Sequence, residues 1–255
     1  MRRLSLTSWS VHHSLTDGSL ALLELPARMR DAGIGTLEIC HFHFRSTDEG
    51  YIGELRGSLE RAGVESFSIL IDTGNISTAD ESRREADLRT IEGWIDVASR
   101  LGTQVVRVVA GEEPPDDEAA LVRSATGLRR VAAYATERGV RVLTENFRSL
   151  LSTSANCNRI LDDLDGAVGL CADMGNFPAS VRLAEFSAIV GRASVVHVKA
   201  SYDDAGSIDA TTLCRCLDTS VQVGFDGPYT LVVYDRDGNS WPRIGELCEI
   251  VGQYV

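Results

Sequence analysis

No apolar run in this 255-residue chain approaches the ~20 residues that a helix needs to cross a bilayer. The first residues, MRRLSLTSWSVHHS, include two arginines but lack the continuous apolar segment of a secretory signal peptide. We therefore expect a cytoplasmic protein with no membrane partner.

Basic residues are also scarce. Lys and Arg together number 25 against 37 Asp and Glu, which gives a formal net charge of −12. A charge of this sign repels phosphate backbones, so we expect no nucleic-acid partner. The arginine-rich pieces SRRE and GLRRV lie in helical patterns with acids between them, which predicts solvated helix faces.

Closely spaced cysteines are few. The six cysteines are scattered, mostly inside apolar patterns, and only Cys214 and Cys216 form a near pair, a weak metal signal. We expect reduced, mostly buried thiols. Glycine (23) and proline (6) occur in ordinary numbers, which excludes collagen-like and disordered classes.

Several well-known catalytic motifs are missing. No G-x-G-x-x-G follows an apolar run, and we find no Walker loop, no HExxH and no GxSxG elbow. Dinucleotide-dependent, P-loop, zincin and serine-hydrolase chemistries are therefore disfavoured.

What the sequence does contain is an alternation of two patterns. Short β-branched or apolar runs recur eight times: LSLTSW, TLEIC, ESFSILI, QVVRVV, VRVLT, VGLCA, SVVHVK and YTLVV. Between them lie longer stretches with helical spacing. Eight such units in about 250 residues predict a single α/β domain over residues 1–255, a (β/α)8 TIM barrel. The alternative, an open doubly wound sheet, lacks its dinucleotide fingerprint.

The helical stretches carry start and stop signals. We predict helices within 19–33, where Pro26 weakens the middle, within 80–102 before Gly102, and within 116–139 before Gly139. Later helices are expected within 182–192, 209–224 and 241–255.

Function in such a barrel lies where strands end and the following loops begin. Glu145, Asp173 and His197 stand at the ends of three successive predicted strands, so we expect them to converge. Taken singly, each has an ordinary explanation as a loop acid, a turn cap and a core histidine. Together they form a site for one divalent metal ion, Mn²⁺, Mg²⁺, Co²⁺ or Zn²⁺. Such an ion polarises a carbonyl, and Glu145 is our candidate catalytic base.

Four segments also resemble a known group. VLTENF, GLCADMGNF, VVHVKAS and GFDGPYTLVV are similar to successive motifs of the xylose-isomerase-like TIM-barrel superfamily, and RTIEGWIDVASRLGTQVVRVVAG resembles its approach to strand four. The resemblance extends from about residue 30 to 235. This superfamily includes sugar-phosphate isomerases and epimerases, ketose 3-epimerases, inosose dehydratases and abasic-site nucleases.

The resemblance implies a Glu after strand five, an Asp after strand six, a His on strand seven and a Glu on strand eight. The first three fall on Glu145, Asp173 and His197. The fourth position holds Val232, with Asp235 three residues later, and Asn176 stands where a His often follows the strand-six Asp. A two-base epimerisation would lack its second glutamate, whereas isomerisation, dehydration or a lyase step needs only one base.

Other polar residues near the strand ends are candidates for substrate contact. His41 and His43, spaced i, i+2, would face one side of an extended strand. Lys199 beside His197 suits an anionic or polyol substrate, and Trp9 can stack on a sugar face. Glu38 is expected inside the barrel, where Arg107 would be its partner. Solvated or structural roles are the alternative for each.

The sequence thus predicts a metal-dependent isomerase or epimerase, or a related lyase or dehydratase, acting on a carbohydrate-like carbonyl or polyol. The alternative is a metal-free, non-catalytic ligand-binding barrel that has lost the strand-eight glutamate. An abasic-site nuclease is disfavoured by the net charge. We expect a small-molecule partner and a homodimer.

Overall fold

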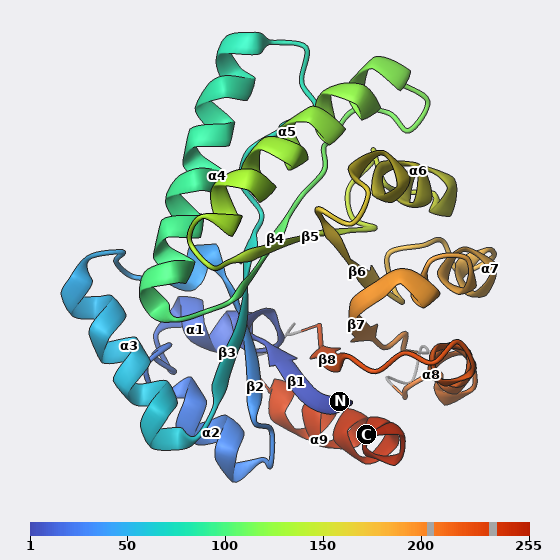
Figure 1. Cartoon of the computed structure of the whole chain (residues 1–255). Helices are drawn as coiled ribbons and strands as arrows, with labels where there is room; N and C mark the ends of the chain where they lie inside the picture. Colours follow the sequence, from blue (N-terminus) through green and yellow to red (C-terminus); the bar gives the residue numbers. More distant parts are fainter. Residues whose placement is uncertain (203–206, 235–238) are drawn as a thin grey trace.

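The eight apolar runs form eight parallel strands, which close into one barrel in the computed structural model (Figure 1). The structure describes residues 1–202, 207–234 and 239–255. Each strand pairs with the next along the chain, and the last pairs with the first, as predicted for a (β/α)8 barrel. The strands are β1 (Arg3–Thr7), β2 (Thr36–Cys40), β3 (Glu65–Ile71), β4 (Val105–Val108), β5 (Arg141–Glu145), β6 (Gly169–Asp173), β7 (Ala193–Lys199) and β8 (Pro228–Val232).

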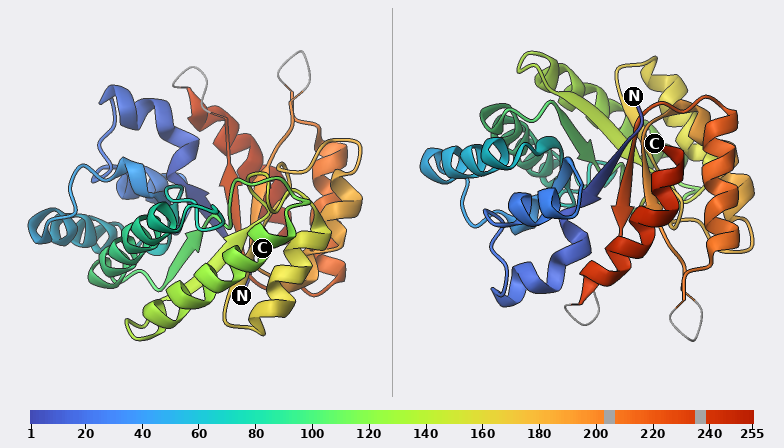
Figure 2. Two further views of the ribbon diagram at one scale, coloured as in Figure 1. Left: turned by 90° about the horizontal axis from the view of Figure 1, so that it is seen from above. Right: turned by 90° about the horizontal axis from the view of Figure 1, so that it is seen from below.

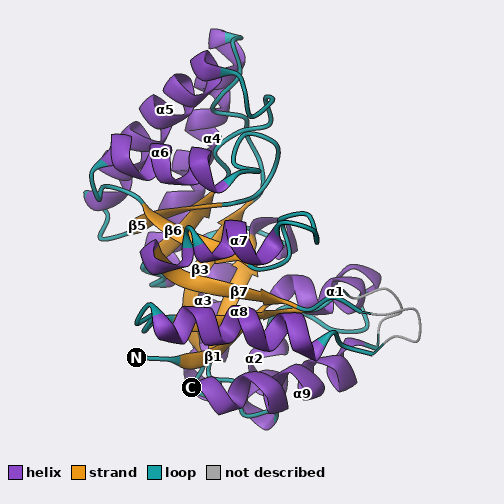
Figure 3. Cartoon of the chain, turned by 90° about the vertical axis from the view of Figure 1, so that its right-hand side faces the viewer, coloured by secondary structure: helices purple, strands orange, loops and turns teal. Residues whose placement is uncertain are grey.

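Helices surround the strands, and the two termini lie side by side (Figures 1, 2 and 3). In the described ranges, no helix is long and apolar enough to span a membrane. The α-helices are α1 (His12–Asp17), α2 (Leu25–Asp31), α3 (Glu49–Ala62), α4 (Glu81–Leu101), α5 (Glu118–Thr136), α6 (Ser154–Leu164), α7 (Arg182–Ser187), α8 (Ala210–Gln222) and α9 (Ser240–Val251). The 3-10 turns are η1 (Ser8–Val11), η2 (His41–His43), η3 (Val190–Arg192) and η4 (Gly252–Tyr254).

Local sequence explains where the long helices begin and end. The side chains of Asp48, Asp80 and Asp117 accept hydrogen bonds from the first turns of α3, α4 and α5, which satisfies backbone donors that no helical carbonyl reaches. Helix α4 ends at Gly102, whose φ of 86° is the left-handed conformation that glycine adopts without strain.

The first predicted helix is wrong in its extent. Residues 19–33 do not form one helix interrupted at Pro26; instead α2 begins at Leu25 and Pro26 lies in its first turn. Proline is tolerated there because the first turn needs no backbone donor from it. The sequence reading did not anticipate α1, α3 and α6.

The barrel interior has an apolar layer below a polar one. Four buried side chains of β4 to β7 form the apolar cluster: Val105, Leu143, Cys171 and Val195. Because strand side chains alternate, residues two positions later point to the same face. Those residues are Arg107, Glu145, Asp173 and His197, and all four are buried. All six cysteines are free thiols, four of them buried, as expected.

Candidate functional site

Glu145, Asp173 and His197 meet at the carboxyl ends of β5, β6 and β7. All three are buried, each with no more than 3% of its surface exposed. Nδ1 of His197 lies 3.6 Å from Oε1 of Glu145 and 3.7 Å from Oδ2 of Asp173. The structure therefore places both carboxylates beside one ring nitrogen, but the group whose potential ligand atoms all lie within 4.8 Å of one another contains Cys171 and not Asp173.

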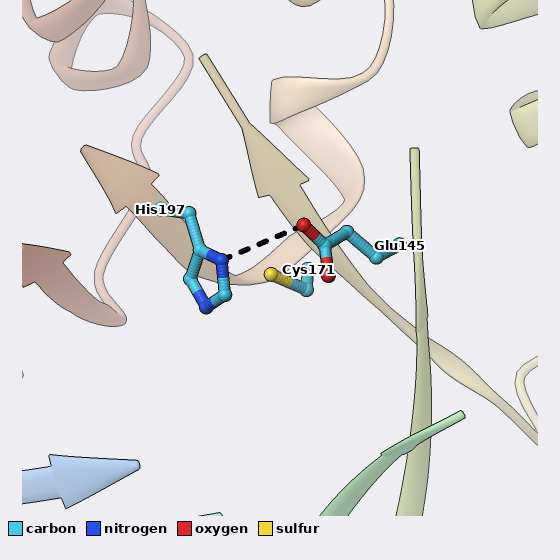
Figure 4. Close-up of side chains that lie close together, drawn as sticks. All are labelled: Glu145, Cys171 and His197. Carbon is cyan, nitrogen blue, oxygen red and sulfur yellow. Dashed lines mark ion pairs between the residues drawn. The ribbon is translucent and has the colours of Figure 1, made fainter. Parts of the chain in front are cut away.

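A fourth donor, Cys171, lies beside them. One potential ligand atom each from Glu145, Cys171 and His197 lie within 4.8 Å of one another, and the three side chains point toward a common centre (Figure 4). Burial raises the pKa of the Cys171 thiol to about 12, so it is neutral near pH 7. The sequence reading missed Cys171 because it lies inside an apolar run, where a cysteine behaves as a small hydrophobe.

The other nitrogen of His197 is held by Glu38. Nε2 lies 3.0 Å from Oε2 of Glu38, whose Oε1 accepts a hydrogen bond of 2.7 Å from Thr230. Burial opposes a charged imidazole, but the carboxylates of Glu38 and Glu145 and the contact with Asp173 raise the pKa of His197 well above its usual value. Glu38 thus orients the ring so that Nδ1 faces the other two carboxylates. The expectation that Glu38 lies inside the barrel is confirmed, but the prediction that it pairs with Arg107 is wrong.

Arg107 instead links β3 to β5. Its Nη1 donates a short hydrogen bond to the carboxylate of Asp72, and its Nε lies 2.8 Å from Oε2 of Glu145. The Nε–H does not point at that oxygen, so the opposite charges attract while Nε and Oε2 both lack a hydrogen-bond partner. A buried donor and a buried acceptor are therefore left unsatisfied side by side at the site.

Two successive hydrogen bonds connect Oε1, the other carboxylate oxygen of Glu145, to Lys199. Asn176 donates from Nδ2 to Oε1 of Glu145 over 3.0 Å, and Lys199 donates from Nζ to Oδ1 of Asn176 over 3.2 Å. Lys199 is the only lysine of the chain. It packs against Gly175, where a Cβ would lie only 2.6 Å from Cδ of Lys199. The Gly-Asn break after β6 therefore makes room for this lysine and supplies the amide that joins it to Glu145.

Asp173 is fixed through its backbone and one carboxylate oxygen. Asn146 exchanges two hydrogen bonds with the backbone of Asp173, at 2.7 and 2.9 Å, and the Gly175 amide donates to Oδ1 over 2.6 Å. Burial raises the pKa of Asp173, but His197 and Lys199 lower it below its usual value overall. The acid is ionised, with Oδ2 turned toward His197. Asn146 was not predicted, although it directly follows Glu145.

These groups line a cavity of about 430 Å³, a size typical of small-molecule sites. Its wall is mixed, with charged groups of the strand ends and four aromatic side chains, Trp9, Phe42, Phe147 and Tyr234. Trp9 lies in η1 and stacks on His12 with ring centres 4.6 Å apart. Val232 lines the cavity at the end of β8, as the register partner of Lys199. Asp235 lies outside the described residues.

His41 and His43 do not lie in an extended strand. They form the 3-10 turn η2, and of this turn only Phe42 lines the cavity. His43 is buried between Ser8 and His12, with nitrogen contacts of 2.7 and 2.9 Å, and Nδ1 of His41 accepts from the backbone of Asp72. The prediction that both face one side is wrong because the chain turns directly after Cys40.

A larger hollow, of about 750 Å³, lies on the outside of the barrel. It is lined by residues of the α1–α2 region, α3 and α9, among them Leu20, Arg28 and Trp241. None of the strand-end acids or the histidine reaches it. We therefore place the candidate site in the smaller cavity, where buried carboxylates, an imidazole and unsatisfied polar atoms converge.

Solved structures with the same fold include several carbohydrate enzymes. An L-ribulose 3-epimerase superposes with a TM-score of 0.71 at 20% identity, covering 99% of this chain and 86% of its own. A D-allulose 3-epimerase from Methylomonas sp. gives 0.75 at 16% identity, covering 99% and 98%. The probable 3-DHS dehydratase AsbF from Bacillus anthracis gives 0.76 at 14% identity, covering 97% and 98%. At these identities the likeness establishes the fold.

No curated protein sequence matches the chain. The sequence does match the xylose isomerase-like TIM barrel family over residues 26–235, which is most of its length. The match includes the ends of β5, β6 and β7. The chain belongs to the xylose isomerase-like TIM barrel family.

Proposed function

We propose that this protein is an isomerase, epimerase or dehydratase of a sugar-like or polyol carbonyl compound, with one divalent metal ion held by Glu145, Asp173 and His197. The observation that carries the proposal is the convergence of these two carboxylates and one imidazole on the wall of the strand-end cavity. The epimerases and the dehydratase with the same fold support this class of reaction.

The residues fit a metal in two respects. Nδ1 of His197 already faces both carboxylates, at 3.6 and 3.7 Å, and Oε2 of Glu145 is a buried acceptor without a hydrogen-bond partner. Carboxylate oxygens and imidazole suit Mn²⁺, Mg²⁺, Co²⁺ or Zn²⁺. When bound, such an ion would polarise the substrate carbonyl and make the neighbouring C–H more acidic.

Glu145 is the proposed base that moves this proton. Asn176 holds its Oε1, while Oε2 has no hydrogen-bond donor and belongs to a side chain that lines the cavity. At the end of β8 the cavity wall is Val232, which cannot exchange a proton. One base suffices for an isomerisation or a dehydration, so we favour these over an epimerisation that needs a base on each side of the carbon.

A metal-free binding barrel is the second candidate, because the buried charges nearly balance without an ion. Protonated His197 and two further cations, Arg107 and Lys199, stand against four carboxylates, those of Glu38, Asp72, Glu145 and Asp173. Arg107 in particular already offsets the charge of Glu145. A ligand could then bind through hydrogen bonds alone.

Metal content and proton exchange separate the two candidates. Wild-type protein, Asp173→Asn and Glu145→Gln would be analysed by elemental mass spectrometry after incubation with Mn²⁺, Co²⁺, Zn²⁺ or Mg²⁺. Each would then be incubated in D₂O with a panel of aldoses, ketoses and inososes, and solvent deuterium at carbon followed by NMR. Glu137→Gln is the matched control, since the Glu137 side chain is 78% exposed.

The proposal expects near-stoichiometric metal in the wild type and the control, and its loss in Asp173→Asn. It also expects chelator-sensitive deuterium uptake that falls at least about 10³-fold in Glu145→Gln, in the range for loss of a general base. Sugar binding that is indifferent to chelator, without metal or exchange, would refute it and support the binding barrel.

A further inference from the structure

Arg148 stands at the mouth of the cavity in an unusual backbone conformation. It directly follows Phe147 in the loop after β5, is exposed to solvent and lines the cavity. Its φ is 63°, in the left-handed region. Of the described residues other than glycine, only Asp165 shares a positive φ, and Asp165 is the C-cap of α6, where this conformation is common.

The backbone at this point would suit glycine or asparagine better. What an arginine adds there is a guanidinium at the cavity mouth. Cζ of Arg148 lies 4.8 Å from the centre of the Phe147 ring, and Cζ of Arg107 lies 5.6 Å from the same ring. The aromatic ring therefore supports two guanidinium groups, one buried and one open to solvent.

The cations of the cavity differ in how far they are engaged. Arg107 is in contact with Asp72 and Glu145, and Lys199 donates to Asn176 and lies near the charge of Asp173. Within the described part of the chain, no carboxylate forms an ion pair with Arg148, although its charge contributes to lowering the pKa of Asp72. Its charge is thus available to a ligand that enters the cavity.

The charge of the cavity also differs from that of the whole chain. The lining residues include three acids and three permanent cations: Asp72, Glu145, Asp173, Arg107, Arg148 and Lys199. The whole chain carries a net charge of −12. An anionic ligand therefore meets no net repulsion at the cavity itself, and a bound divalent ion would make the cavity more attractive to it.

From this arrangement we infer that the substrate is an acidic carbohydrate, whose carboxylate or phosphate group binds Arg148 at the mouth while its carbonyl end reaches Glu145. This inference rests on the proposed function and narrows its substrate class. A planar guanidinium with several donors matches either group, and the cavity of about 430 Å³ accommodates a six-carbon acid.

Binding of a matched ligand series tests the inference without requiring turnover. The probes are D-fructose, its 6-carboxylate D-fructuronate and D-fructose 6-phosphate, titrated by calorimetry with and without Mn²⁺. The proteins are the wild type, Arg148→Gly, Arg148→Lys and the control Arg56→Ala, an exposed arginine of α3 away from the cavity. Arg148→Gly is chosen because glycine adopts the local φ without strain, so it should fold at least as well as the wild type.

The expected result is at least tenfold tighter binding of one acidic probe than of fructose by the wild type and by Arg56→Ala. Arg148→Gly should abolish that preference, with Arg148→Lys in between. Comparison of the two acidic probes identifies the group, carboxylate or phosphate.

Equal affinity for neutral and acidic probes, a preference that survives in Arg148→Gly, or no binding of any probe would overturn the inference. The proposed function fails separately, if the wild type binds the acidic probe in an Arg148-dependent way but no compound exchanges its proton through Glu145.

Discussion

Arg107 and Glu145 form a buried ion pair, in which Nε and Oε2 lie 2.8 Å apart without a hydrogen bond between them. Both side chains are almost fully buried, so each charge depends on the other and on the polar groups nearby. The unaligned pair leaves one buried donor and one buried acceptor without a hydrogen-bond partner beside the cavity.

Arg107→Met should destabilise the protein strongly. The substitution removes the cation and leaves the carboxylates of Asp72 and Glu145 buried without it, and breaking a buried pair in this way costs about 3–5 kcal/mol. Urea unfolding at pH 7 measures the loss, and Arg56→Ala, an exposed change, should stay within about 0.5 kcal/mol of the wild type. If the two variants are equally stable, Arg107 has no such structural role.

Gly175→Ala should impair the site without unfolding the protein. The added Cβ would lie within 2.9 Å of Cβ, Cγ and Cδ of Lys199, so the lysine side chain must move away from Asn176 and the backbone that carries it must shift. We expect a loss of about tenfold or more in kcat/KM, equivalent to about 1.4 kcal/mol, on whichever substrate the exchange screen identifies. Amine labelling provides a second readout, since Lys199 is the only lysine and should react faster once displaced. An unchanged labelling rate would show that Lys199 has not moved.

The free energy of unfolding should decrease as the pH falls, because protonation of His43 favours the unfolded chain. Burial, with His12 and His41 nearby, lowers the pKa of His43 to about 3, whereas the unfolded chain takes up this proton near pH 6.5. The stabilisation is therefore present above pH 6.5 and is lost as the pH falls toward 3. Between pH 6.5 and 5 this amounts to about 2 kcal/mol.

His43→Gln isolates this effect, because glutamine keeps hydrogen-bonding groups but takes up no proton. Urea unfolding at pH 6.5 and pH 5 should show a smaller acid loss for the variant than for the wild type, by about 2 kcal/mol. Parallel losses in both proteins would mean that other groups dominate the acid sensitivity.

Val232→Glu should strengthen metal binding. The side chain lines the cavity beside Lys199 and stands where the family resemblance places a glutamate. A further carboxylate would add an oxygen donor and a negative charge to the site, so we expect at least tenfold tighter Mn²⁺ binding by calorimetry. Val232→Gln, which has the same shape without the charge, is the control. Equal affinity of the two variants would indicate that position 232 does not reach the ion.

Much of the architecture follows from local sequence. Each strand from β2 to β8 begins and ends within one residue of the bounds of a predicted apolar run. Helix α4 ends directly before Gly102, as predicted. These features depend on side-chain periodicity and backbone preferences, which neighbouring residues set. The same periodicity predicts that Glu145, Asp173 and His197 share a level of the barrel, because equivalent ends of parallel strands meet there.

The sequence does not predict which polar side chains pair with one another across the barrel. Glu38 and Arg107 both lie inside, but the choice of His197 for one and of Asp72 and Glu145 for the other depends on strand register and side-chain reach. The roles of Cys171 and Asn146 depend likewise on neighbours 26 or more positions away in the sequence.

The turn after β2 was likewise not predictable from the sequence pattern. His41 and His43 have the spacing of an extended strand, but η2 forms and sends His43 toward Ser8 and His12. The sequence by itself determined the alternation of strands and helices and the level at which the acids and the histidine stand, because those depend on local periodicity. Only the tertiary structure decided which charges neutralise one another and which buried polar atoms remain without a hydrogen-bond partner, because those depend on distances between strands far apart in the chain.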